Sequence, residues 1–216
     1  MTQDSAQSIM ERLKESTSSM HSAAESSSFQ GELAQGALPL KVYGDYLEQL
    51  YLVHKTLEDE IAKHRHEGHK FADVVTPEQF QENFLKHDLV AMGREYDKLT
   101  PLVSTNKLMQ AMHKYSASHA VALLGMHYVL LGSKHGGKFI AKSCQAAYQF
   151  DDACGVMYFD PYGPNFMPVW KAFKDEMNQL TLTDAEADAL CEAAGLMFNG
   201  IGEIGAELNS RTASKV

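Results

Sequence analysis

The chain has 216 residues, of which 44% are hydrophobic and 22% are charged, and its formal net charge is -9 at pH 7. This composition is typical of an ordinary globule, the length suits one domain, and a disordered chain is excluded. The negative charge repels polyphosphate, so we expect no nucleic acid among the partners.

Cysteine usage and the chain ends predict a cytoplasmic protein without a membrane partner. The three cysteines are widely spaced and form no Cys-x-x-Cys pair, which argues against a disulfide framework and a structural zinc site and fits a reducing compartment. The first residues lack a basic start followed by an apolar core. The longest apolar stretch, near residues 120–131, is short and interrupted by His127, and residues 209–216 are polar.

Apolar residues recur at helical spacing from the beginning of the chain. Those from Ile9 to Ala24 mark a first helix. After Pro39, apolar residues at three- and four-residue spacing predict a second helix over residues 43–61. This helix should end before the polar residues 64–70.

The middle of the chain is predicted to be helical as well. Residues 76–79 (TPEQ) resemble an N-cap, a Pro at the first helical position and a Gln that can close a capping box, so a helix should begin there and run through Leu89. A further helix should span about residues 106–132 and resume after several glycines through Ala147.

The last third of the chain combines a loop with two more helices. Residues 150–168 are rich in loop-forming residues, apolar spacing predicts a helix at residues 170–180, and a second capping box (TDAE) at residues 183–186 opens a final helix. No segment shows period-two alternation bounded by turns. We therefore predict an all-α fold in a single domain over residues 1–216, with an ordered helical core at about residues 8–208 and polar termini.

His21 is the first candidate for chemistry, because it lies in the first predicted helix with Glu25 one turn later. An imidazole at position i and a carboxylate at i+4 share a helix face, so Glu25 can contact one ring nitrogen and leave the other for a metal. The alternative is that His21 is exposed to solvent or forms hydrogen bonds in the core, as most histidines of soluble proteins do.

Three glycines, Gly132, Gly136 and Gly137, interrupt an otherwise apolar helix. Each costs about 1 kcal/mol relative to Ala in a helix interior, so three within six residues require a reason. They form either a plain helix break and turn or a place where the backbone lies close to a flat ligand.

Lys171 and Lys174 are three residues apart and share a helix face. Two ammonium groups there can meet two carboxylates of a ligand. The alternative is a solvated face.

Four motifs follow one another along the chain. They are residues 13–25 (LKESTSSMHSAAE), residues 57–61 (LEDEI), residues 131–138 (LGSKHGGK), and residues 177–180 (MNQL) followed by Thr183 and a final helix around Phe198. From about residue 10 to residue 208 this series resembles the heme oxygenase family. The first motif looks like that family's proximal-helix signature, the second is similar to the acidic end of its second helix, and the third resembles its distal-helix motif, Leu-Gly-Asp-x-x-Gly-Gly-Gln.

The resemblance implies a single-domain bundle of helices with heme b between a proximal helix and a kinked distal helix. By the same resemblance, His21 is the axial ligand of the heme iron and Glu25 orients it. Gly132 and Gly136 then shape the site of dioxygen.

Further residues match positions that bind heme in the family. Lys174 falls where the family has a propionate-binding Arg, whereas Trp170 falls where a second basic residue is usual, a role that Lys171 can take over. Lys14 is a further candidate for a propionate, and Phe198 matches an aromatic residue of the heme pocket.

The chain departs from the family at Ser133, where an Asp is usual. In heme oxygenases that carboxylate holds waters that deliver a proton during ring opening, and a hydroxyl cannot supply its charge. His135 and His127 are possible substitutes, so Ser133 or His135 is expected to anchor the waters.

The activity implied by the resemblance is the oxidative cleavage of heme to biliverdin, carbon monoxide and ferrous iron. Heme is both substrate and cofactor, dioxygen is consumed, and electrons come from a donor such as a ferredoxin, a flavodoxin or a flavin reductase. A heme-binding protein for sensing, storage or delivery, without efficient ring opening, is the second hypothesis. A thiamin-hydrolysing enzyme of the related helical fold is a third, but none of the three cysteines lies in a suggestive motif.

Overall fold

The computed structural model describes residues 7–66, 71–151 and 154–213, and throughout these ranges the regular elements are helices. The α-helices are α1 (Ile9–Glu25), α2 (Ser28–Gln35), α3 (Leu40–His66), α4 (Phe71–Val74), α5 (Glu82–Ala91), α6 (Val103–Ser118), α7 (Leu123–Gly132), α8 (Lys134–Tyr148), α9 (Phe166–Gln179) and α10 (Asp184–Ala213). Short 3-10 turns occur at Pro77–Gln79, Ala120–Ala122 and Gly163–Asn165. The predicted all-α fold is confirmed.

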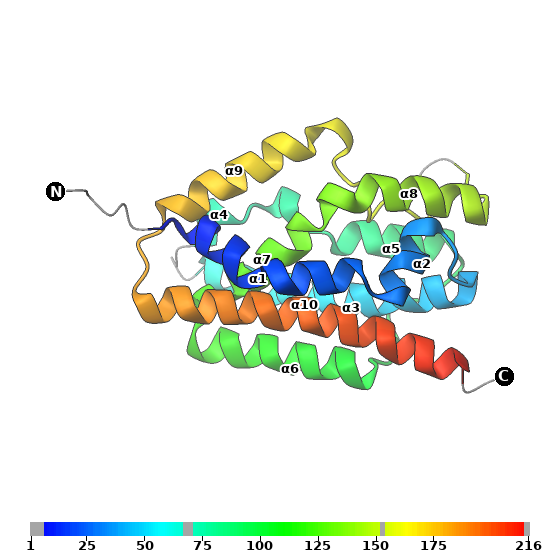
Figure 1. Cartoon of the computed structure of the whole chain (residues 1–216), viewed down its shortest axis with the longest axis horizontal. Coiled ribbons are helices and arrows are strands. Elements are labelled where there is room, and N and C mark those ends of the chain that lie inside the picture. Colours follow the sequence, from blue (N-terminus) through cyan, green and yellow to red (C-terminus); the bar gives the residue numbers. More distant parts are fainter. Residues whose placement is uncertain (1–6, 67–70, 152–153, 214–216) are drawn as a thin grey trace.

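The long helix α10 lies at the centre of the helical packing. It packs against α1, α6 and α7, while α3 packs against α5 and α6. Figure 1 shows α10, in orange and red, running beside the dark blue α1, with the green α6 on its other side. These contacts bury apolar side chains such as Leu13, Leu47 and Met197, and each such side chain contributes about 1.5 to 3 kcal/mol. In the described ranges no helix is both long enough and apolar enough to cross a membrane.

Capping boxes begin the first and the last helix. At α1 the Ser8 side chain accepts from the backbone N–H of Glu11, whose carboxylate accepts from the Ser8 N–H at 3.0 Å. At α10 the carboxylate of Glu186 accepts from the backbone N–H of Thr183 at 2.8 Å, and the Thr183 hydroxyl accepts in return. The capping box predicted at residues 183–186 is therefore confirmed.

The helix start predicted at residues 76–79 was wrong. These residues form only a 3-10 turn, Thr76 caps nothing with its side chain, Phe80 is extended, and α5 begins at Glu82. The physical reason lies in Gln79, which is buried and bonds to Val74 O and to His127. Its amide is therefore engaged in the core and does not close a capping box.

The helix predicted over residues 106–132 is interrupted. The chain leaves the helical conformation at His119, with φ -146° and ψ 64°, so that α6 and α7 are separate helices. The break brings α7 directly against α10, where a Cβ on Gly125 would lie 2.0 Å from Leu190 O. There are two smaller differences. Helix α3 continues to His66, past its expected end. Helix α2, which was not predicted, begins directly after its N-cap residue Ser27.

The glycine-rich motif forms the junction between α7 and α8. Ser133 joins the two helices, and a Cβ on Gly137 would lie 1.8 Å from the backbone oxygen of Phe159. A Cβ on Gly136 would meet nothing within 4 Å. The absent side chain of Gly137 therefore lets the loop at residues 154–165 lie against α8, which is a close approach of protein to protein rather than of backbone to ligand.

These two glycines predict opposite effects on stability. Gly137→Ala should lower the free energy of unfolding by about 1 to 3 kcal/mol, because the methyl group meets backbone that must shift. Gly136→Ala, the matched control in the same helix, should leave it unchanged or raise it by up to about 1 kcal/mol. Urea unfolding of the apoproteins measures both, and equal effects of the two changes would contradict this account.

Candidate functional site

A cavity of about 1210 Å³ lies between α1 and the α7–α8 junction. It is larger than most small-molecule pockets, which measure about 300 to 1,000 Å³. Its walls include Lys14 and His21 of α1, Gly132 and Ser133 at the junction, Trp170 of α9 and Phe198 of α10. The cavity can therefore hold a large ligand between two helical walls.

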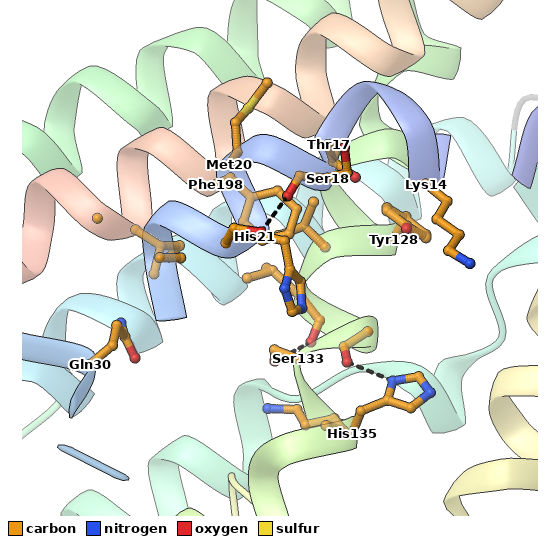
Figure 2. A pocket seen from close by; sticks show the side chains of 18 of the residues that line it. Lys14, Thr17, Ser18, Met20, His21, Gln30, Tyr128, Ser133, His135 and Phe198 are labelled. Atoms are coloured by element: carbon orange, nitrogen blue, oxygen red, sulfur yellow. Dashed lines mark hydrogen bonds between the residues drawn. The ribbon is translucent and has the colours of Figure 1, made fainter. Parts of the chain in front are cut away.

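His21 extends from α1 into this cavity. Figure 2 shows its ring pointing across the cavity toward Ser133 on the opposite wall. The ring of Phe198 meets it edge-on, with the centroids 5.9 Å apart and an interplanar angle of 67°. Neutral imidazole is a common metal ligand, so the helix presents a nitrogen donor to whatever fills the cavity. The side chain of Glu25, predicted to orient His21, lies outside the described part of the chain.

The opposite wall carries Ser133 and His135. The Ser133 hydroxyl donates to Leu130 O at 2.7 Å, and the Nδ1 of His135 bonds to Gly132 O at 2.8 Å. The His135 ring lies edge-on against Phe166 and Trp170 and is turned away from His21 in Figure 2. Both predicted residues therefore line the cavity, but both use a polar group to satisfy the backbone where the helix changes direction.

His127 is placed in the core instead of the cavity wall. It is buried, its Nε2 bonds to the Gln79 side chain at 2.9 Å, and its ring packs against Phe173. Burial is the main cause that lowers the pKa of His127 to about 3, and the nearby His54 is the second cause. The ring is therefore neutral at physiological pH. The geometry thus does not bring His127 to the position where it was expected to hold waters.

Of the predicted lysines, Lys14 and Lys174 line the cavity. Lys171 is outside it: its ammonium group pairs with the Asp175 carboxylate at 2.5 Å on an exposed part of α9. Gly136 is also exposed and is outside the lining that the described residues form. The structure therefore separates Lys171 from Lys174, although the sequence places them on one helix face.

Behind the wall at Ser133 lies a buried polar cluster that the sequence analysis did not single out as a site. The carboxylate of Glu58 accepts from His54 Nδ1 at 3.0 Å, and His54 Nε2 bonds to the Tyr158 hydroxyl at 3.0 Å. Glu58 also accepts the backbone N–H groups of Gln81, at 2.6 Å, and Glu82, at 3.2 Å. This pattern is satisfied when His54 is neutral, with its proton on Nδ1.

Burial governs the protonation of this cluster. It raises the pKa of Glu58 to about 7, against the opposing backbone N–H donors, and it lowers the pKa of His54 well below its ordinary value. The spacing of His54 and Glu58, four residues apart within an apolar stretch, was the available signal in the sequence. It equals the spacing of His21 and Glu25.

Comparison with known proteins identifies the family that this chain matches. The family model described as heme oxygenase matches residues 7–204. A heme oxygenase of Rhodella violacea is 25% identical over a region that covers 92% of this chain and 86% of the relative.

Solved structures agree on the fold. The heme complex of heme oxygenase-1 from Synechocystis sp. PCC 6803 matches with a TM-score of 0.86 and 20% identity, covering 97% of this chain and 96% of that one. A putative TenA-like thiaminase from Sulfolobus solfataricus matches with a TM-score of 0.67 and 11% identity, covering 92% and 96%. At these identities the structural likeness shows the fold alone.

The raised pKa of Glu58 predicts a pH dependence of stability. A carboxyl group whose pKa rises from 4.5 to about 7 on folding contributes stability below pH 4.5 that is lost as the pH rises through 7. Glu58→Gln cannot ionise, so the variant does not lose this stability as the pH rises. Between pH 5 and 7 the free energy of unfolding of Glu58→Gln should therefore increase relative to that of the parent, by about 1 kcal/mol per pH unit. Urea unfolding at several pH values tests this.

Glu95→Gln, which removes an exposed carboxyl group outside this cluster, is the control and should follow the parent's pH profile. Parallel profiles for Glu58→Gln and the parent would show that Glu58 is ionised throughout.

Proposed function

The chain belongs to the heme oxygenase family, and on that basis we propose that it binds heme b in the cavity between α1 and the α7–α8 junction and cleaves it oxidatively to biliverdin, carbon monoxide and ferrous iron. Heme supplies the redox-active iron and is itself the substrate. Dioxygen and electrons, from a donor such as a ferredoxin, a flavodoxin or a flavin reductase, complete the reaction. The observation that carries the proposal is His21, which points across a cavity of about 1210 Å³ toward the glycine-rich junction (Figure 2).

The residues of the cavity fit a flat, iron-containing ligand with two carboxylates. His21 offers an imidazole nitrogen to iron, and the edge-on ring of Phe198 restricts how that imidazole turns. Trp170 lines the cavity and packs edge-on against His135. The lining combines aromatic side chains such as Trp170 and Phe198 with polar ones such as Asn178, and cofactor sites likewise combine apolar walls with placed polar groups.

Two lysines of the cavity are the candidates for binding the propionates. Lys14 comes from α1 and Lys174 from α9, two helices that pack against each other, and both side chains line the cavity. An ammonium group binds a carboxylate through a charge-assisted hydrogen bond, which is stronger than a neutral one. We infer that these two lysines, without Lys171, fix the rotation of the ring in its plane.

The second candidate is a heme-binding protein of the same fold that does not open the ring efficiently. It is favoured by Ser133, whose hydroxyl donates to Leu130 O and supplies no charge. A thiamin-hydrolysing enzyme finds less support than either, because burial raises the pKa of Cys144 to about 11. A nucleophilic thiol requires the opposite shift.

Hemin titration followed by a reductant tests the proposal, with His21→Ala as the decisive variant. Hemin added to the parent should give a Soret band that decays to a biliverdin spectrum when dioxygen and a competent reductase are supplied. In His21→Ala the nitrogen ligand is missing, so the ferric spectrum should change and turnover should cease. Circular dichroism of the apoprotein should be unaltered, because the His21 side chain is exposed to the cavity rather than packed in the core.

Each contrary outcome has its own meaning. A stable Soret band in the parent supports the heme-binding protein, and no band at all overturns both candidates. An unaltered axial-ligand signature of His21→Ala in resonance Raman spectra contradicts the assignment of the ligand.

The two cavity lysines predict a defined loss of affinity. Lys14→Ala combined with Lys174→Ala should weaken hemin binding by about tenfold or more, since each well-formed charge-assisted hydrogen bond contributes about 1.5 to 3 kcal/mol and less where water screens it. Lys138→Ala, which removes an exposed ammonium group that does not line the cavity, is the control and should keep the parent's affinity. Equal affinities of the double variant and Lys138→Ala would contradict the propionate clamp.

A further inference from the structure

Lys134 is a buried lysine without a hydrogen bond. It is the first residue of α8, only 5% of it is exposed, and among the described residues its Nζ has no hydrogen-bond partner. Lysine is almost never fully buried unless it is paired, because taking an amine or ammonium group out of water costs free energy. The position of this group therefore requires an explanation that the protein's own hydrogen bonds do not give.

The neighbours of Lys134 hold its amine without bonding to it. Nζ lies 3.1 Å from the centroid of the Tyr158 ring, which is a cation–π contact. Burial lowers the pKa of Lys134 well below its ordinary value, and the carboxylates of Asp88 and Glu58 oppose this shift. Both carboxylates already accept backbone N–H groups, Asp88 those of Met157 and Tyr158. The amine can therefore turn away from the ring without breaking a hydrogen bond.

Lys134 also lies at the wall that faces His21. It lines the cavity together with Tyr158, and it directly follows Ser133, toward which His21 points in Figure 2. The other polar groups of this wall are committed, because the Ser133 hydroxyl donates to Leu130 O and His135 Nδ1 bonds to Gly132 O. Lys134 thus brings a buried amine without a hydrogen-bond partner to the wall opposite His21, directly after Ser133.

We propose that Lys134 is a ligand-binding residue of the cavity, whose ammonium group turns from the Tyr158 ring to donate a hydrogen bond to an oxygen-containing or anionic ligand held opposite His21. The ligand gains a hydrogen bond, and the protein loses none. An anionic ligand beside the amine favours its charged form against the effect of burial, which makes the bond charge-assisted. The inference rests on the proposed function, because the place of the ligand is set by an iron that His21 binds.

Fluoride binding to the ferric hemin complex tests this role without turnover. Fluoride is a small anion that accepts hydrogen bonds, so its affinity reports a donor opposite His21. Lys134→Met keeps the unbranched shape of the side chain and removes the donor, and fluoride affinity should fall by about tenfold or more. Lys138→Met, on the exposed side of the same helix, is the matched control and should leave fluoride affinity within about twofold of the parent's.

The apoprotein gives a second readout. Because the amine has no hydrogen-bond partner to leave unpaired, Lys134→Met should unfold in urea at the parent's midpoint or above it. A variant that fails to fold would show that Lys134 has a structural role and would overturn the inference. So would an unchanged fluoride affinity in a variant that binds hemin as the parent does. Absence of a Soret band in the parent would instead refute the proposed function, on which the inference rests.

Discussion

The buried carboxylate of Glu58 ties together the segments that form one wall of the cavity. From α3 it accepts the backbone N–H groups of Gln81 and Glu82 at the start of α5, and it accepts from His54 on its own helix. His54 in turn bonds to Tyr158, whose side chain lines the cavity. A buried carboxylate is costly unless its oxygens accept hydrogen bonds, so satisfying this one group fixes where α5 and the loop at residues 154–165 lie relative to α3.

Local signals in the sequence predicted the fold wherever tertiary contacts did not compete with them. The capping box at residues 183–186 formed because its side chains lie near the surface, where they bond to each other and to the two backbone N–H groups of the box. The similar pattern at residues 76–79 did not, since Gln79 bonds to His127 in the core. Likewise the periodicity of residues 106–132 is helical throughout, and the break at His119 follows from the packing of α7 on α10, which no local pattern contains.

The site was predictable to the extent that a helix face determines it. His21 and Lys14 follow from one face of α1, but the shared face of Lys171 and Lys174 did not reveal that only Lys174 lines the cavity. Lys134 could not be found in this way, because a lysine among glycines reads as a solvated turn. Its burial arises from the close approach of the loop to α8 at Gly137, where a Cβ would lie 1.8 Å from Phe159 O.

Ser133 and Lys134 must be considered as one unit. The family resemblance leads to the expectation of a carboxylate at position 133, which accepts hydrogen bonds, whereas an ammonium group at position 134 can only donate them. In the role proposed for Lys134, the wall opposite His21 would therefore offer a ligand a donor in place of an acceptor. An aspartate introduced at the exposed position 133 would add a negative charge to this wall, which favours the charged form of the Lys134 amine and disfavours an anionic ligand. A change at position 133 alone thus alters two groups at once, and only its combination with a change at Lys134 separates the effect of the carboxylate from the loss of the donor.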